Sequence, residues 1–104
     1  MKKIIDGLLY DTEAEGTKRL GERSYLYPGD HNYLSEELYR TASGRFFLAG
    51  EGGANSDYRT LIPGGASEGR DIRALDEDQA YRWMEEHADV ETTLEHFPDH
   101  VQEA

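Results

Sequence analysis

Acidic side chains are concentrated in the last quarter of the chain. Residues 76–104 hold 10 Asp or Glu and one Arg, Arg82, which gives a net charge of −9. Residues 1–75 hold 12 acids and 10 Lys or Arg, which gives a net charge of −2. Carboxylates gathered in one segment attract cationic partners. A solvated helical face has the same pattern, so the charge asymmetry leaves both interpretations open.

The acids favour binding to a basic protein surface. A protein that handles nucleic acid holds phosphates in a Lys- and Arg-rich channel. Rows of Asp and Glu on helices approximate the charge density of duplex DNA, about one charge per 1.7 Å. We therefore expect a stoichiometric inhibitor that occupies such a channel. Its partner-binding residues would be Glu77, Asp78, Glu85, Glu86, Asp89, Glu91 and Glu95.

Tyrosines offer an alternative contact surface. The chain has seven Tyr, more than a thin core needs, and Tyr is favoured in protein interfaces. The secondary partner-binding candidates are Tyr33, Tyr39 and Tyr58, and Tyr25 and Tyr27 are also expected to be exposed. Such a protein would be an adaptor without nucleic-acid mimicry, and a homodimer through an edge strand stays open. Charge-driven binding weakens with salt far more than aromatic binding does.

Sequence motifs for catalysis or metal binding are missing. Without Cys there is no thiolate metal site, and the glycine-rich segment 50–56 lacks the Gly-Lys-Ser/Thr ending of a P-loop. His96 and His100 are separated by a proline, which breaks the helix that would align them. The adjacent acids Glu36 and Glu37 point to opposite faces of a strand and cannot act as a pair. We therefore expect no enzyme, no cofactor and no metal.

Charge and hydropathy also limit the partners and the compartment. A net charge of −11 repels nucleic-acid phosphates and anionic membranes, so we expect no direct nucleic-acid or membrane binding. No apolar run approaches the roughly 18 residues of a membrane span. Residues 1–6 lack the apolar core of a signal peptide, so we expect a cytoplasmic protein.

The elements that position these residues begin with strands. The length of 104 residues allows a single domain, residues 1–104, in which residues 1–75 predict an antiparallel sheet of about four to five strands. Asp6-Gly7 between apolar triplets predicts a type I′ hairpin, and Ala42-Ser43-Gly44 predicts a second hairpin turn between strands. We expect this second pair to be covered on one face and partly exposed on the other. Further strands are expected near residues 24–27, 58–62 and 70–75, and residues 17–20 fit a short strand or a helical turn.

After residue 75 the spacing of the apolar residues becomes that of a helix. Asp76 and Gln79 form a capping-box pattern at the start of a helix over residues 76–88. Its apolar face carries Ala80, Trp83, Met84 and His87 at helical spacing, with Trp83 as the main anchor. Asp89 predicts the cap of a second short helix with inward-facing Val90, Leu94 and Phe97, and residues 98–104 predict a frayed tail. The expected fold is α+β, with an acidic helical region (76–97) packed on one face of the sheet.

Several segments together carry a family resemblance. They are residues 1–7, 9–13, 38–41, 44–48 and 50–53, the stretch from Leu75 to Trp83, and Glu85-Glu86-His87. This set resembles short acidic proteins of phages, plasmids and integrative elements of Gram-positive bacteria, among which anti-CRISPR proteins occur. The resemblance covers roughly residues 1–97 and departs at residues 22–30 and 54–70. It implies an inhibitor of a host CRISPR effector, without catalytic residues.

Overall fold

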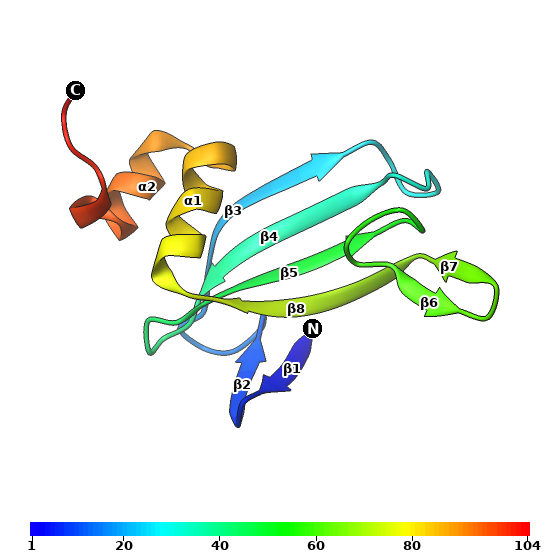
Figure 1. Cartoon of the computed structure of the whole chain (residues 1–104). Helices are drawn as coiled ribbons and strands as arrows, with labels where there is room; N and C mark the ends of the chain where they lie inside the picture. The colour runs from blue at the N-terminus through cyan, green and yellow to red at the C-terminus, as the bar shows by residue number, and fades with distance from the viewer.

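The computed structural model describes residues 1–104 and has an α+β fold, as the sequence predicts (Figure 1). A main antiparallel sheet has the order β3-β4-β5-β8, and β1-β2 and β6-β7 form separate two-stranded hairpins. No helix of the structure has the length and apolar character needed to cross a membrane. The strands are β1 (Lys2–Ile5), β2 (Leu8–Asp11), β3 (Lys18–Tyr25), β4 (Leu34–Arg40), β5 (Phe46–Gly52), β6 (Thr60–Ile62), β7 (Gly65–Ser67) and β8 (Gly69–Leu75); the helices are α1 (Glu77–His87), α2 (Val90–His96) and the 3₁₀-helix η1 (Pro98–His100).

Local turn chemistry creates both predicted hairpins. Asp6 and Gly7 have φ values of 51° and 78°, the left-handed pair that a type I′ turn requires, so the predicted turn between β1 and β2 is confirmed. Gly44 ends the turn between β4 and β5 with a φ of 91°. The Thr41 amide donates to the Arg45 carbonyl at 2.8 Å, which closes this second hairpin.

The strand predictions around β3 and β7 need correction. Residues 17–20 and 24–27 were expected as separate elements, but β3 runs continuously from Lys18 to Tyr25 through a bulge between Arg19 and Gly21. Leu26 leaves strand geometry with a φ of 64°, so the strand ends before it. The short strand β7 lies between the expected strands at 58–62 and 70–75, where the sequence analysis expected none. It pairs with β6 because Gly64, at a φ of 83°, reverses the chain between them.

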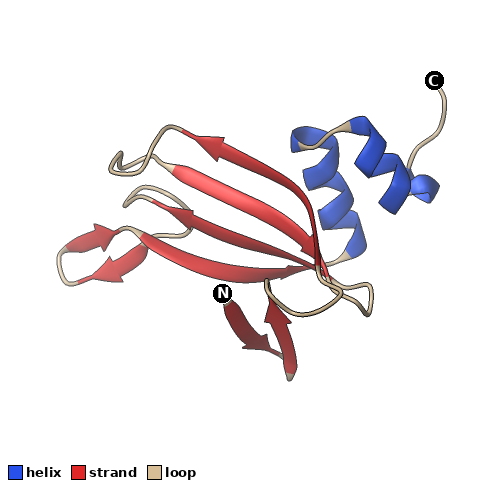
Figure 2. Cartoon of the chain, turned by 180° about the vertical axis from the view of Figure 1, so that it is seen from behind, coloured by secondary structure: helices blue, strands red, loops and turns tan.

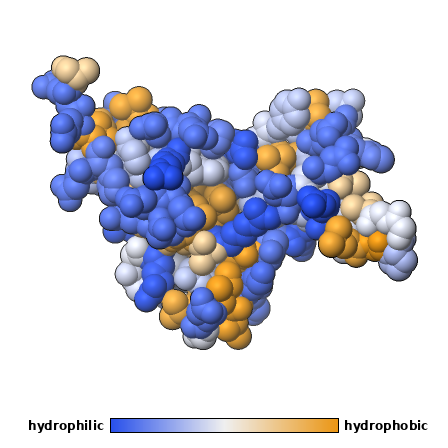
Figure 3. All heavy atoms as spheres, viewed as in Figure 1, coloured by the Kyte–Doolittle hydropathy of each residue, from blue (hydrophilic) through white to orange (hydrophobic).

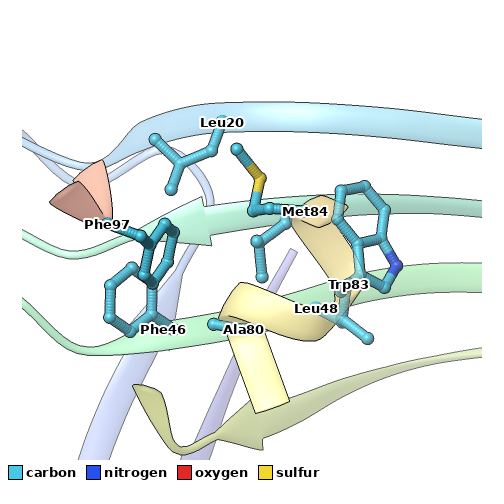
Figure 4. Packing of buried hydrophobic residues seen from close by; sticks show 8 residues of the cluster. Leu20, Phe46, Leu48, Ala80, Trp83, Met84 and Phe97 are labelled. Atoms are coloured by element: carbon cyan, nitrogen blue, oxygen red, sulfur yellow. The ribbon is translucent and has the colours of Figure 1, made fainter. Parts of the chain in front are cut away.

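Both faces of the main sheet carry a hydrophobic cluster. On the helix side, Trp83, Met84 and Ala80 of α1 pack onto side chains of the sheet and onto Phe97 (Figure 4). The other members of this cluster are Leu20, Leu38, Phe46 and Leu48. On the opposite side, Tyr10 of β2 covers a smaller cluster with Phe47, Ala49 and Ile72. Seen from behind, the β1-β2 hairpin and the helices lie on different sides of the main sheet (Figure 2). The hairpin therefore covers the face that the sequence left partly exposed.

Both helices begin at the predicted capping residues, but some side chains that were expected to be buried are exposed. The Asp76 side chain accepts from the Gln79 amide, and the Gln79 side chain accepts from the Asp76 amide, so the capping box is confirmed. Val90 and Leu94 were expected to face inward, yet they are 69% and 42% exposed. Phe97 takes the core position instead and is 1% exposed, because α2 ends there and the chain turns its ring onto Phe46.

The C-terminal residues are more ordered than a frayed tail. Pro98–His100 forms η1, and the His100 ring stacks on Tyr81 with centroids 4.9 Å apart. Its Nε2 lies 3.2 Å from an Asp78 carboxylate oxygen. The expected tail is therefore limited to residues 101–104, which have no regular secondary structure.

Candidate protein-binding surface

The seven acids selected from the sequence all lie on the helical end of the molecule and are exposed. We call this set the acidic helical surface: Glu77, Asp78, Glu85, Glu86, Asp89, Glu91 and Glu95. The first four belong to α1, Asp89 caps α2, and the last two belong to α2. The helical end is largely hydrophilic in a space-filling view (Figure 3). Residues near one another in the chain thus remain together on the folded surface.

The acids of the two chain regions differ in their partners. Every Lys or Arg salt bridge lies within residues 1–75, and these bridges are Lys3–Asp71, Arg19–Glu22, Arg19–Glu37 and Arg23–Glu36. The ion pairs of the helical region are formed with histidines: Asp78 pairs with His100, Glu86 with His87, and Glu95 with His96. Negative charge in the sheet region is therefore partly neutralised inside the molecule. On the acidic helical surface it is left for solvent or for a partner.

Two members of the acidic helical surface also have structural roles. The Asp89 carboxylate accepts from the amide and hydroxyl of Thr92, each at 3.0 Å. The backbone hydrogen bond, followed by the hydroxyl bond, lowers the pKa of Asp89. Glu85 accepts from the Tyr81 hydroxyl at 2.7 Å. Glu77, Glu86, Glu91 and Glu95 have no hydrogen bond from another side chain, and they are the most available for a partner.

The charge density of α1 is lower than the sequence suggested. Eleven residues make a helix of about 16 Å, at about 1.5 Å per residue. Four acids and Arg82 give α1 a net charge of −3, or about one charge per 5 Å, against about one per 1.7 Å in duplex DNA. The helix therefore does not match duplex density.

The three candidate tyrosines are less exposed than expected. Tyr58 is 3% exposed, so its expected place on the surface is wrong. Tyr39 is half-buried and stacks on Phe47 with centroids 5.2 Å apart, and its pKa is raised, chiefly by burial. Tyr33 is also half-buried and donates to Glu51 at 3.1 Å. Tyr25 and Tyr27, at 59% and 67% exposed, are the tyrosines that do face solvent.

A buried carboxylate lies at the centre of the helix-side face. Glu36 is 6% exposed and accepts three hydrogen bonds: from Arg23 Nε at 2.7 Å, from Trp83 Nε1 at 3.2 Å and from the Tyr58 hydroxyl at 2.5 Å. These donors come from β3, α1 and the loop after β5. The sequence analysis considered Glu36 only as a catalytic partner of Glu37 and did not place it in the core. Its position between Leu34 and Leu38, on the same face of β4, was the signal that it points inward.

The electrostatics of this site favour a permanent carboxylate. Burial by itself would raise the pKa of Glu36, but the hydrogen bonds from Tyr58, Arg23 and Trp83 outweigh it and hold the pKa below its ordinary value. Burial, together with the neighbouring carboxylate, raises the pKa of Tyr58. All the bonds of Glu36 go to the protein itself, and this arrangement suits a structural cross-link better than a proton-transfer site.

Two glycines, Gly50 within β5 and Gly69 at the start of β8, make room for the same cross-link. The Tyr58 ring lies directly across Gly50, where any Cβ would overlap it. A Cβ on Gly69 would meet the Tyr58 carbonyl oxygen. The glycine-rich segment therefore lets the chain fold back closely over the sheet. This explains its composition without a bound ligand.

No family model, no curated protein and no solved structure matches this chain.

Proposed function

We propose that the protein is a stoichiometric inhibitor that binds the basic surface of a nucleic-acid-handling protein. The observation that carries this proposal is the absence of Lys or Arg partners for the acidic helical surface, in contrast to the paired acids of the sheet. Exposed, unneutralised carboxylates gain most from a cationic partner. Inhibition of this kind needs neither covalent chemistry nor a cofactor.

The proposed complex forms by electrostatic steering followed by close contact. The field of the acidic end accelerates encounter with a Lys- and Arg-rich channel and orients the helices toward it. Once bound, the helices exclude phosphates from that part of the channel. The resemblance to mobile-element proteins favours a CRISPR effector as the target, and its guide- or DNA-binding groove would supply the basic surface.

The test compares two variants that each remove four charges. The helix variant carries Glu77→Gln, Glu86→Gln, Glu91→Gln and Glu95→Gln, at positions without side-chain hydrogen bonds. The sheet variant carries Glu13→Gln, Glu15→Gln, Asp57→Asn and Glu68→Gln, which are equally exposed. Each is titrated against purified guide-loaded CRISPR effectors at low and high salt, and binding of target DNA is measured.

We expect the native protein and the sheet variant to block DNA binding at near-equimolar ratio. The helix variant should associate more slowly and inhibit weakly, with the largest difference at low salt. Equal inhibition by both variants would remove the acidic helical surface from the mechanism. A native protein that inhibits no effector, even in excess, would remove this class of target.

One observation favours a second candidate function, that of an adaptor that binds a partner without mimicking nucleic acid. Tyr25, Leu26 and Tyr27 are 59%, 44% and 67% exposed, and Leu26 has a left-handed φ that is uncommon for its residue type. This apolar tip lies at the end of the sheet away from the helices (Figure 1). A partner held there would bind with little salt dependence. Tyr25→Ser with Tyr27→Ser, rather than the helix variant, would then abolish binding.

A further inference from the structure

One pocket of this acidic protein is lined by basic side chains. It has a volume of about 360 Å³ and lies where the start of β3 meets the β4-β5 turn and the end of α2. Lys18, Arg40 and His96 line it together with the hydroxyl-bearing residues Thr41 and Ser43. No carboxylate lines it, although the chain has 22 acids. The lining of the pocket is therefore basic, whereas the protein as a whole is acidic.

Two of these cations face each other across a strand pair. Lys18 of β3 is the direct register partner of Arg40 of β4, so both side chains leave the sheet on the same face. Like charges directly opposite in an antiparallel pair destabilise it. Neither residue forms a salt bridge, whereas Arg19 and Arg23 on the same strand each have a carboxylate partner. An anion bound between Lys18 and Arg40 would remove this repulsion.

The Arg40 guanidinium is already oriented at the pocket. Its Nη1 donates to His96 Nδ1 at 3.1 Å, and its central carbon lies over the Phe46 ring, 5.3 Å from the centroid. The Thr41 and Ser43 hydroxyls are 3.1 Å apart beside it. The backbone amides of Thr41, Gly44 and Arg45 are used within the turn. A ligand in this pocket would therefore meet the side chains of Lys18, Arg40 and Ser43 rather than these three amides.

We propose that this pocket binds a small phosphate, either inorganic phosphate or the phosphate of a small monoester. A tetrahedral dianion accepts hydrogen bonds from a guanidinium, an ammonium group and hydroxyls at the same time, which are the donors present. The carboxylate that approaches His96 is Glu95, whose oxygen lies 3.8 Å from Nε2 on a side chain that is 70% exposed. Arg40 contacts the other ring nitrogen, Nδ1, and Glu95 does not line the pocket. This site is independent of the proposed inhibitor function.

The test is an NMR titration of the full chain with sodium phosphate, with ionic strength held constant by sodium chloride. We expect saturable shifts of the His96 ring signals and of the Ser43 amide, with His31, which is exposed and outside the pocket, unmoved. Lys18→Gln should weaken binding about tenfold, since it removes a charge-assisted hydrogen bond. Lys2→Gln is the matched control, because Lys2 is exposed and lies outside the pocket.

A second arm uses glycerol phosphate and a second variant, Ser43→Ala. Saturable binding of glycerol phosphate assigns the site to monoesters, and binding of inorganic phosphate alone assigns it to the free ion. Ser43→Ala keeps both cations and should weaken binding of the accepted ligand by a smaller factor than Lys18→Gln. Shifts that rise linearly without saturation, or equal weakening by Lys18→Gln and Lys2→Gln, would overturn the proposal.

Discussion

Glu36 joins three distant parts of the chain through one carboxylate. Glu36→Ala would leave Arg23, Tyr58 and Trp83 without their shared acceptor, and two of these donors are buried. We expect a loss of about 3 kcal/mol in the free energy of unfolding, because breaking a buried ion pair leaves unsatisfied groups behind. Urea denaturation measures this loss.

The matched control for that variant is the neighbouring acid. Glu37 points to the other face of β4 and bridges exposed Arg19 at 2.9 Å. Glu37→Ala should cost less than about 1 kcal/mol, the usual size of a surface pair. Similar losses for both variants would show that the hydrogen bonds of Glu36 do not hold the helix side together.

Two histidines give the fold a dependence on pH. Burial lowers the pKa of His87 and of His96 below the ordinary 6.5, with further lowering from Arg23 and Arg40 respectively. The unfolded chain then binds more protons than the folded chain as pH falls through about 6.5, so stability decreases in that direction. The double variant His87→Gln with His96→Gln should flatten the free energy of unfolding between about pH 7 and pH 5. His31→Gln, at an exposed position, should leave the slope as it is.

The β1-β2 hairpin depends on its turn rather than on packing at the turn. A Cβ on Gly7 would meet nothing within 4 Å, so Gly7→Val is disfavoured only by its φ of 78°. We expect a loss of about 1–2 kcal/mol, seen as a lower melting temperature. Gly65→Val is the control, since Gly65 has equal space and no positive φ. A Gly7→Val protein as stable as Gly65→Val would contradict the type I′ assignment.

Short-range chemistry made most of the elements predictable. The Asp6-Gly7 turn, the Gly44 turn and the Asp76 capping box depend on neighbouring residues, and all three occur as the sequence indicates. The positions that sequence reasoning misplaced depend on distant contacts. The alternation of β4 indicates that Glu36 points inward, but its contact with Tyr58, 22 residues away, follows from no local pattern.

In the candidate surface, too, the features set by neighbouring residues were predictable and those set by distant contacts were not. Asp78, Glu85 and Glu86 lie on the predicted helix 76–88, away from the face of Ala80 and Met84, so their exposure follows from helical periodicity. The inward face of α2 was misassigned because periodicity alone does not say how the second helix turns onto the core. Phe97 fills that position after the helix has ended, which leaves Val90 and Leu94 exposed.

The net charge of −11 affects the stability of the whole molecule. Because the helical region has no Lys or Arg salt bridge, its acids repel one another at low salt. Raising NaCl from about 20 to about 300 mM shortens the Debye length and should raise the melting temperature by about 4–8 °C, equivalent to about 1 kcal/mol. The helix variant should show a smaller rise and the sheet variant nearly the full one. A melting temperature independent of salt would show that repulsion among these acids does not destabilise the fold.

The chain has one Trp, and its indole donates to Glu36 within the cluster between α1 and the sheet. Its fluorescence is thus a built-in optical probe of that face alone. The cluster under the β1-β2 hairpin contains Tyr10 and Phe47 and no Trp. Hydrogen exchange at the amides of β2 reports on that second face. Recorded along the same denaturant series, the two signals show whether both sides of the sheet melt as a single cooperative unit, without any added label.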